Sequence, residues 1–165
     1  MTSKVPIVLV DIDGTLADND ARFAHYFPDD ALTHDWSDSH WTDYDKACFG
    51  DAPIPYVVEI VNTLALSYEI QLITGRHDVA EPETTLWLEA MAVDYDGLSM
   101  RAPGDYSRNP VFKRAIAEMF LAEGREIHLV IDDHPGVIAE LGELGIDGLH
   151  VQRPSSWNHR HRSHG

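Results

Sequence analysis

The sequence predicts an α/β fold: a three-layer, doubly wound (Rossmann-like) parallel sheet with helices on both faces. Short apolar runs rich in β-branched residues, of which residues 5–10 and 127–131 are the clearest, alternate with longer segments of helical periodicity. Several of these runs stop abruptly at a polar residue, as buried parallel strands do. The alternation extends over a chain of 165 residues, which predicts one domain with a covered sheet.

The first strand is expected at residues 5–10, where it stops at Asp11 and is followed by a turn at Gly14 and Thr15. Residues from about 18 to 52 are rich in Asp, His, Trp and Tyr and lack a clear period. We expect them to form a small insertion, irregular or partly helical, with no large cap. Proline residues then favour a helix start, and four side chains are expected on its buried face: Val57, Ile60, Val61 and Leu64.

A second strand is expected at residues 69–73, ending at Thr74, and a helix at residues 81–91. A brief third strand is expected at residues 98–100. The helical pattern that follows, at residues 111–122, is expected to bury four side chains: Ala115, Ile116, Met119 and Phe120.

The clearest strand, at residues 127–131, is halted by Asp132 and Asp133. A helix at residues 137–144 and a last strand at residues 149–151 complete the predicted domain, which we place at residues 1–153. The polar tail at residues 154–165 is expected to be disordered. Its alternative interpretation is a weak metal-binding or anion-binding tail that uses three histidines: His159, His161 and His164.

Composition narrows the class of protein. Hydrophobic residues make up 44% and charged residues 24% of the chain, which is ordinary for a globular protein. A single cysteine, Cys48, rules out an internal disulfide framework, and no signal-peptide pattern opens the sequence, so we expect a cytoplasmic protein. The apolar runs are too short to span a bilayer, and no membrane partner is expected.

The formal net charge of -16 works against non-specific binding to nucleic acid or anionic lipid. A phosphorylated substrate remains compatible with this charge, because bound divalent cations reverse its sign locally.

Polar residues end three of the predicted strands, at Asp11, Thr74 and Asp132, and Lys113 begins a helix between two of them. Open α/β sheets bind ligands at this carboxyl edge, so these side chains are expected to converge there. With Asp13 and Asp133 they bring several carboxylates together, and a hard dication with oxygen ligands is the natural compensation.

Mg²⁺ fits this donor set best, and no cluster has zinc spacing. The Thr74 hydroxyl, the backbone N–H of Gly75 and the Lys113 ammonium are suited to the oxygens of a phosphoryl group.

The sequence resembles the haloacid dehalogenase superfamily over residues 5–151. The resemblance rests on four motifs in order, each in its expected context: DIDGT at residues 11–15, TGR at residues 74–76, Lys113, and the acidic pair at residues 132–133. It implies a phosphatase in which Asp11 attacks phosphorus and forms an aspartyl-phosphate.

The resemblance further implies that Asp13 is the general acid and then the base, and that its backbone carbonyl also faces Mg²⁺. Thr74 and Lys113 would bind the phosphoryl group, and Asp132, with Asp133, would complete the metal site with Asp11. Substrate binding is expected from six further residues: Gly14, Thr15, Gly75, Arg76, Arg101 and Arg108.

A narrower similarity links residues 100–105, Lys113, residues 131–133 and the Trp87–Leu88 pair to the phosphatase half of phage polynucleotide kinase-phosphatases. Those enzymes remove 3′-phosphates from nucleic acid ends. No GxxxxGK[ST] phosphate loop occurs in the sequence, so only the phosphatase activity is implied.

The expected substrate is therefore a nucleic acid 3′ end or a nucleotide, and the sequence identifies no protein partner. The alternatives are a phosphatase of a free nucleotide or small phosphometabolite, and a non-catalytic phosphate-binding module. A receiver-type signalling domain is disfavoured because its acidic pair follows the first strand and its phosphoacceptor comes later, which is the reverse of the order here.

Several charged residues have a second interpretation. Asp133 alternatively caps the following helix, which would leave Asp132 alone to hold the metal. Arg76 alternatively pairs with a nearby carboxylate instead of the substrate. Arg101 and Arg108 are alternatively solvated surface residues.

The aromatic and histidine side chains near the motifs also have two interpretations. His77 and His134 directly follow site motifs, and each either contacts substrate or makes a hydrogen bond at a helix terminus. Trp36 and Trp41 either stack on a base or pack the insertion against the sheet. With Tyr44, they are the residues that would hold a mononucleotide.

Overall fold

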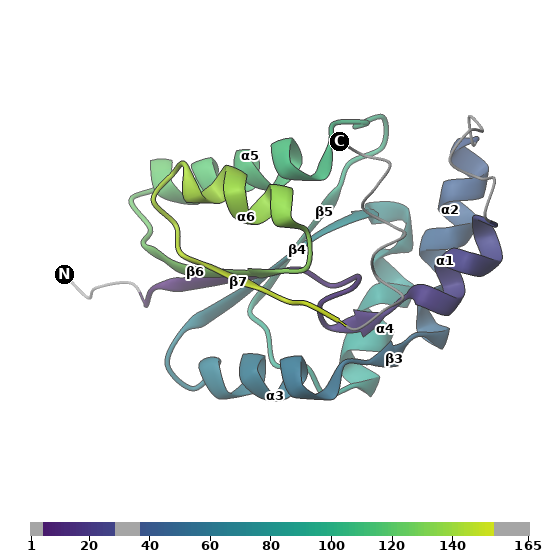
Figure 1. The fold of residues 1–165 in the computed structure, drawn as a ribbon, viewed down its shortest axis with the longest axis horizontal. Coiled ribbons are helices and arrows are strands. Elements are labelled where there is room, and N and C mark those ends of the chain that lie inside the picture. Colours follow the sequence, from purple (N-terminus) through teal and green to yellow (C-terminus); the bar gives the residue numbers. More distant parts are fainter. Residues whose placement is uncertain (1–4, 29–36, 154–165) are drawn as a thin grey trace.

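The computed structural model describes residues 5–28 and 37–153. Its centre is a parallel sheet of five strands in the order β5-β4-β1-β6-β7 (Figure 1). The strands are β1 (Ile7–Val10), β4 (Glu69–His77), β5 (Gly97–Arg101), β6 (Ile127–Asp132) and β7 (Gly148–His150). The doubly wound parallel sheet predicted from the sequence is confirmed.

The two faces of the sheet are covered by different helices, as Figure 1 shows. On one face lie α3 (Pro55–Leu64) and α4 (Glu81–Ala90), and on the other lie α5 (Asn109–Ala122) and α6 (Pro135–Gly142). Strand β1 alternates between them: Val8 and Val10 pack with the first pair, whereas Ile7 and Leu9 pack with the second. Burial on both faces explains why β1 is apolar at every position.

The helical predictions hold for position but not for every buried face. In α3, Val57 and Val61 are buried, but Ile60 is exposed, which contradicts the prediction. In α5, Ile116 and Phe120 pack against the core as expected, whereas Ala115 and Met119 are exposed.

The apolar positions of α5 alone misplaced its buried face, because Lys113 also lies on that face. Phe112, Lys113 and Ala117 are the buried residues of this helix, which turns Met119 toward solvent.

The insertion after β1 is small and partly helical, as predicted. It contains α1 (Asp20–Tyr26), α2 (Asp38–Lys46) and the 3-10 helix η2 (Ala47–Gly50). Strands β2 (Ala17–Asp18) and β3 (Ala52–Pro53) pair antiparallel and so join the two ends of the insertion. The two insertion helices lie beside the carboxyl ends of the sheet strands, at the right of Figure 1.

Trp36 and the predicted tail at residues 154–165 lie outside the described residues. The boundaries of the domain, 1–153, therefore stay a prediction. Within the described ranges, no helix combines the length and the apolar character needed to cross a membrane.

Candidate active site

The strand ends bring the predicted residues together at one edge of the sheet. Asp11 directly follows β1, Thr74 lies near the end of β4, and Asp132 ends β6. Because β1 is the central strand, with β4 and β6 on either side, these three side chains are neighbours. All three are buried.

Lys113 joins two of these acids. Its Nζ donates to Asp11 Oδ1 at 2.6 Å and to Asp132 Oδ2 at 2.7 Å. The lysine reaches them from the second turn of α5, and its side chain is only 3% exposed. Burial would lower the pKa of Lys113, but the two carboxylates outweigh burial and raise it, so the ammonium is a fixed positive charge.

Asp11, Asp132 and Asp133 form a compact group of buried carboxylates. One oxygen from each lies within 4.8 Å of the others. Burial raises the pKa of Asp11, and the charges of Asp132 and Asp133 raise it further, while Lys113 acts in the opposite direction. One ammonium therefore compensates three acids incompletely. This oxygen-only set fits a hard dication such as Mg²⁺.

The turn after β1 fixes the spacing of this group. The Thr15 hydroxyl donates to Asp11 Oδ2 at 3.1 Å and accepts from the backbone N–H of Asp133 at 3.1 Å. Gly14 has a φ of +83°, and a Cβ at this position would lie 2.2 Å from Asp133 Oδ2. Only glycine allows the turn to pass this close to the acid.

The carboxylate of Asp13 does not belong to this group of acids and lies between two buried arginines. Arg22 Nη2 donates to its Oδ1 at 2.5 Å, and Arg76 donates to its Oδ2 at 2.9 Å and its Oδ1 at 2.7 Å. Burial alone would raise the pKa of Asp13, but the charges and hydrogen bonds of the arginines outweigh burial and hold this pKa far below its usual range. The Asp13 side chain is therefore a carboxylate in this structure.

Arg76 thus follows its second interpretation and pairs with a carboxylate. The Asp13 side chain is thus paired with the arginines. That its backbone carbonyl faces the metal site stays a prediction.

Arg22 and Asp51 complete this arrangement and were not predicted from the sequence. Arg22 Nε donates to both carboxylate oxygens of Asp51, at 3.1 and 3.0 Å, and Nη1 donates to the backbone carbonyl of Tyr44 at 3.0 Å. The guanidinium carbon also lies 4.2 Å from the centre of the Tyr44 ring. The sequence signal for this role was a single arginine within an acidic insertion. Because the insertion has no helical period, the sequence could not predict which residues this arginine contacts.

Thr74 and Gly75 were expected to follow the second strand, but they lie within β4, which continues to His77. Thr74 is fully buried, and its Oγ1 accepts from the backbone N–H of Arg76 at 3.3 Å. A Cβ on Gly75 would lie 2.6 Å from Asn109 Oδ1, so the backbone of β4 approaches the start of α5 closely.

Arg101 holds these two segments together. Its Nε donates to the carbonyl of Gly75 at 3.2 Å, its Nη2 to Asn109 Oδ1 at 2.7 Å and its Nη1 to the carbonyl of Ser107 at 2.7 Å. Arg101 is buried, so the interpretation as a solvated residue is wrong for it, whereas Arg108 is exposed.

The capping alternatives are also resolved. The cap of α6 is His134, whose Nδ1 accepts from the backbone N–H of Gly136 at 3.0 Å, as its second interpretation expected. Asp133 is therefore not the cap of this helix, and its carboxylate lies with those of Asp11 and Asp132.

His77 differs from its predicted alternative. The side chain makes no cap bond to the following 3-10 helix, η3 (Asp78–Ala80), and instead pairs with Asp45 of α2.

Trp41 and Tyr44 pack inside the insertion. The Trp41 ring lies 4.4 Å from that of Phe27, and Tyr44 is buried against Phe27 and Arg22. Trp41 is thus a packing residue, but its ring partners belong to the insertion and not, as expected, to the sheet.

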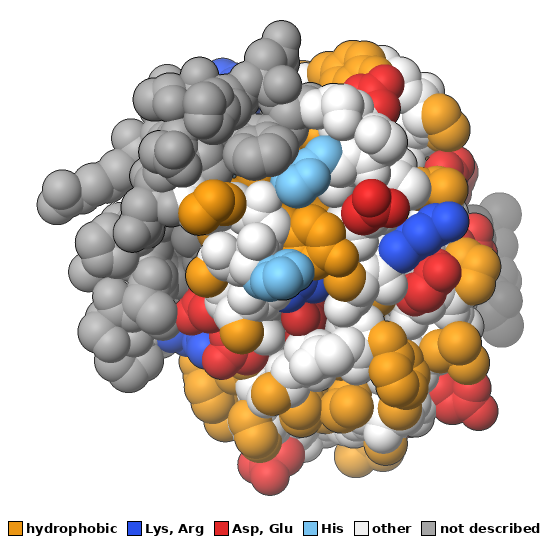
Figure 2. All heavy atoms as spheres, turned by 90° about the vertical axis from the view of Figure 1, so that its right-hand side faces the viewer, with side chains coloured by type: hydrophobic (Ala, Val, Ile, Leu, Met, Phe, Trp, Pro, Cys, Tyr) orange, Lys and Arg blue, Asp and Glu red, His pale blue; other side chains and the backbone are white. Residues whose placement is uncertain are grey.

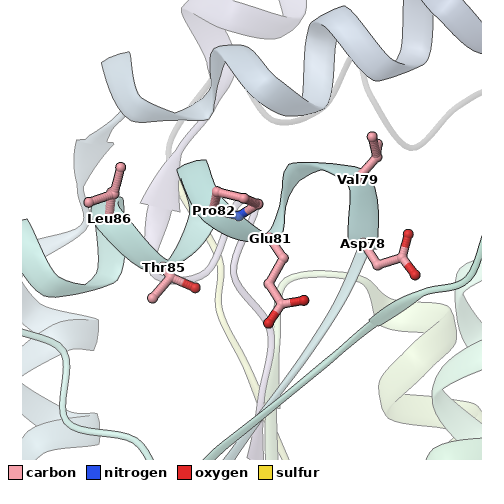
Figure 3. Close-up of a pocket in the computed structure, with 6 residues that line it drawn as sticks. All are labelled: Asp78, Val79, Glu81, Pro82, Thr85 and Leu86. Carbon is pink, nitrogen blue, oxygen red and sulfur yellow. The ribbon is translucent and has the colours of Figure 1, made fainter.

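A surface groove of about 710 Å³ lies on η3 and α4, apart from the grouped acids. In Figure 3 its acidic side chains, Asp78 and Glu81, point to one side, whereas Val79 and Leu86 point to the other. The groove brings no set of chemical groups together, so the edge of the sheet remains the candidate site.

The fold and the motif residues at this edge define a hydrolase of the haloacid dehalogenase type. A family model described as the polynucleotide kinase PNKP phosphatase domain matches residues 5–155, and the chain belongs to this family. Residues 5–155 are therefore a phosphatase domain of this family. No curated protein matches the sequence.

Solved structures share the fold. A chain of the Pnkp1/Rnl/Hen1 complex superposes with a TM-score of 0.69 at 24% identity, over 92% of this chain and 47% of that one. This chain thus spans about half the length of that relative. The haloacid dehalogenase-like protein SP0104 from Streptococcus pneumoniae gives a TM-score of 0.66 at 17% identity, over 97% of this chain and 92% of that one.

A third structure, of the family enzyme BT-2542 from Bacteroides thetaiotaomicron, contains magnesium and inorganic phosphate. It has a TM-score of 0.55 at 14% identity and covers 96% of this chain and 100% of its own. At these identities the structures establish the fold.

Proposed function

We propose that the protein is a Mg²⁺-dependent phosphomonoesterase that acts through an aspartyl-phosphate on Asp11, with nucleic acid 3′-phosphate ends or nucleotides as substrates. The observation that carries the proposal is the Lys113 ammonium held between Asp11 and Asp132, with Asp133 beside them. In the proposed reaction these side chains supply the nucleophilic carboxylate, the fixed cation and the metal-binding oxygens at one buried point.

Asp11, Asp132 and Asp133 would hold Mg²⁺, together with the backbone carbonyl of Asp13. When bound, the ion neutralises charge on the phosphoryl oxygens and on the grouped acids. Lys113 supplies a second positive charge, and Thr74 with the N–H of Gly75 donates to the remaining phosphoryl oxygens. The exposed Arg108 and the turn at Gly14 and Thr15 are the other substrate-binding candidates.

In the first step, an Asp11 oxygen forms a bond to phosphorus while the bond from phosphorus to the ester oxygen breaks. The leaving oxygen takes a proton from Asp13. In the second step Asp13 accepts a proton from water, the water oxygen bonds to phosphorus, and the bond to Asp11 breaks, which releases phosphate.

The two arginines favour one of these roles of Asp13 over the other. As a carboxylate, Asp13 is ready to accept the proton of water. To donate to the leaving group, Asp13 must first carry a proton, which it keeps from the water of the preceding turnover. This requires that the pairs with Arg22 and Arg76 loosen when substrate arrives, because both stabilise the charged form.

The substrate class follows from the family match and is restricted by charge. A net charge of -16 leaves little attraction for a long polyanion. Figure 2 supports this view: on the face that it shows, the described residues form no broad basic patch, and acidic, basic and apolar side chains are interspersed. The substrate contact is therefore local, at the terminal phosphate and the nucleotide that carries it.

The test is phosphate release from a 3′-phosphorylated oligonucleotide, a 3′-mononucleotide and a 5′-mononucleotide, each with Mg²⁺ and with a chelator. We expect turnover only with the metal, and abolished turnover in Asp11→Asn, because an amide is not a competent nucleophile. Asp13→Asn should slow hydrolysis of the covalent intermediate, so acid-quenched phosphoenzyme should accumulate. Near-wild-type activity of Asp11→Asn would refute the assigned nucleophile, and faster release from the 5′-mononucleotide would move the substrate class away from 3′ ends.

A further inference from the structure

A second surface pocket, of about 550 Å³, lies in the insertion beside the arginines that hold Asp13. Two residues of that arrangement, Arg22 and Asp51, form its inner wall, and both are buried. Its rim comes from α1, β2 and η2 and includes the partly exposed Tyr26. The volume is that of a small-ligand pocket, so a large aromatic side chain fits in it.

This pocket favours a cationic occupant. Three carboxylates line it, those of Asp18, Asp20 and Asp51, against one guanidinium, that of Arg22. Arg22 is moreover shared with Asp13, to which its Nη2 donates at 2.5 Å. The side chains of Asp18 and Asp20 are 34% and 23% exposed, so an occupant can reach both charges. Electrostatic complementarity therefore selects a positively charged partner.

The chain passes the rim of this pocket after its last strand. Arg153, which follows β7, binds the carboxylate of Asp18: its Nη1 donates to Oδ1 at 3.0 Å, and its Nη2 donates to Oδ2. The same Nη1 lies 3.8 Å from Asp20 Oδ2. Counted with Arg22, Arg153 still leaves the three lining acids one positive charge short. Residue 154 therefore follows an arginine that is already fastened to the acidic rim.

Residues 154–165 match the pocket in charge and in reach. They contain Arg160, Arg162 and three histidines but no acidic residue, since all 28 Asp and Glu residues of the chain precede them. Trp157 supplies a large aromatic side chain four residues after Arg153. Four extended residues span up to about 14 Å and nine span up to about 32 Å, so the tryptophan and both arginines can reach the pocket.

We propose that residues 154–165 dock in this pocket, with Trp157 beside Tyr26 and the two arginines at the acidic rim. The covalent link keeps this segment at an effective concentration of about a millimolar, which favours it over a separate basic chain. The docked segment covers the inner wall of the pocket and excludes water from the ion pairs that hold Asp13. This inference does not depend on the substrate or on the proposed reaction.

The experiment attaches a spin label to the full chain through Ser163→Cys and records amide signals by NMR. The native Cys48 is buried, so the introduced thiol is the one that reacts. The signals of Ala21 and Ala52, which line the pocket, should be lost through paramagnetic broadening and should return when the label is reduced. The signal of Gly124 should persist, because this residue lies between α5 and β6, at the opposite edge of the sheet.

Two sets of variants locate the contact. On the docking segment, Trp157→Ser with Arg160→Gln and Arg162→Gln should restore the pocket signals, and these changes leave the described domain intact. On the rim, Asp18→Asn with Asp20→Asn should do the same. The matched control is Glu140→Gln with Glu143→Gln, which removes the same charge at α6 and should leave the broadening unchanged.

Three results would overturn the inference. The first is that the pocket signals stay sharp in the spin-labelled chain. The second is that the broadening survives the changes at Trp157, Arg160 and Arg162, a test that holds even if the rim variant does not fold. The third is broadening in a mixture of isotope-labelled chains without the spin label and spin-labelled chains without the isotope, which would assign the pocket to the same segment of a second copy.

Discussion

Replacement of Arg22 by alanine tests how much the two-arginine site around Asp13 contributes to the stability of the fold. The substitution removes hydrogen bonds to Asp13 at 2.5 Å and to Asp51 at 2.8, 3.0 and 3.1 Å, all from a side chain that is 4% exposed. Among the described residues, Asp51 then keeps a longer side-chain contact, 3.8 Å from Arg76. A buried carboxylate would thus lose its main partner.

The expected loss follows from that burial. Removal of one partner from a buried ion pair costs about 3–5 kcal/mol, because the other charge stays desolvated and uncompensated. A domain of this size loses about 2–4 °C of Tm for each kcal/mol, which gives a decrease of roughly 6–20 °C. The measurement is urea unfolding followed by circular dichroism, with a thermal scan of the same samples.

Arg114→Ala is the matched control. Arg114 also contacts three carboxylates, those of Glu118, Glu140 and Glu143 at 2.9, 2.9 and 3.0 Å, but it is partly exposed on α5. Solvent screening should leave its removal with little effect. The reasoning is refuted if the two variants lose similar stability, or if Arg22→Ala unfolds at the same urea concentration as the wild type.

Three further predictions concern the grouped acids, the turn at Gly14 and the carboxylate of Asp13. Saturation with Mg²⁺ at about 100 times its Kd should raise Tm by roughly 5–10 °C, and Asp133→Asn should remove this shift; an equal shift in the variant would locate the ion elsewhere. Gly14→Ala should lower the free energy of unfolding, measured in urea, more than Gly104→Ala does. Both glycines have a positive φ near +80°, but only at Gly14 would the added Cβ lie 2.2 Å from Asp133 Oδ2. Equal losses would mean that the Asp133 side chain moves aside freely. Because the pKa of Asp13 is lowered on folding, its ionisation stabilises the fold above about pH 4, the usual pKa of an aspartate, and this contribution is lost as the pH falls further. Below that pH the slope of unfolding free energy against pH should be flatter in Asp13→Asn than in the wild type. An unchanged slope would contradict the pairing of Asp13 with the arginines.

The parts of the site that were predicted from sequence depend on local patterns. An apolar run that stops at a polar residue marks the end of a buried strand, which placed Asp11 and Asp132 at the sheet edge without any knowledge of their neighbours. The same pattern led to Thr74, although β4 continues beyond it to His77. Sequence order then added Lys113, whose helix is fixed between two of those strands.

The parts that were missed depend on tertiary contacts. The role of Arg22 is set by Asp13 and Asp51, and the latter lies 29 residues away on the far side of the insertion. No period in the insertion places these residues together. The exposed Met119 is a similar case, because the orientation of α5 follows a buried ion pair and not its apolar stripe.

The central place of β1 has a consequence for the synthesis of the protein. Its four aliphatic residues leave the ribosome before either partner strand. Strand β1 pairs on one side with β4, Ile7 opposite Glu69, and on the other with β6, Ile7 opposite Ile127. At roughly 5–20 residues per second, the second partner follows many seconds later. During that interval an apolar segment of high β-propensity has an open edge, and it is the place where a nascent chain of this protein would most need a chaperone.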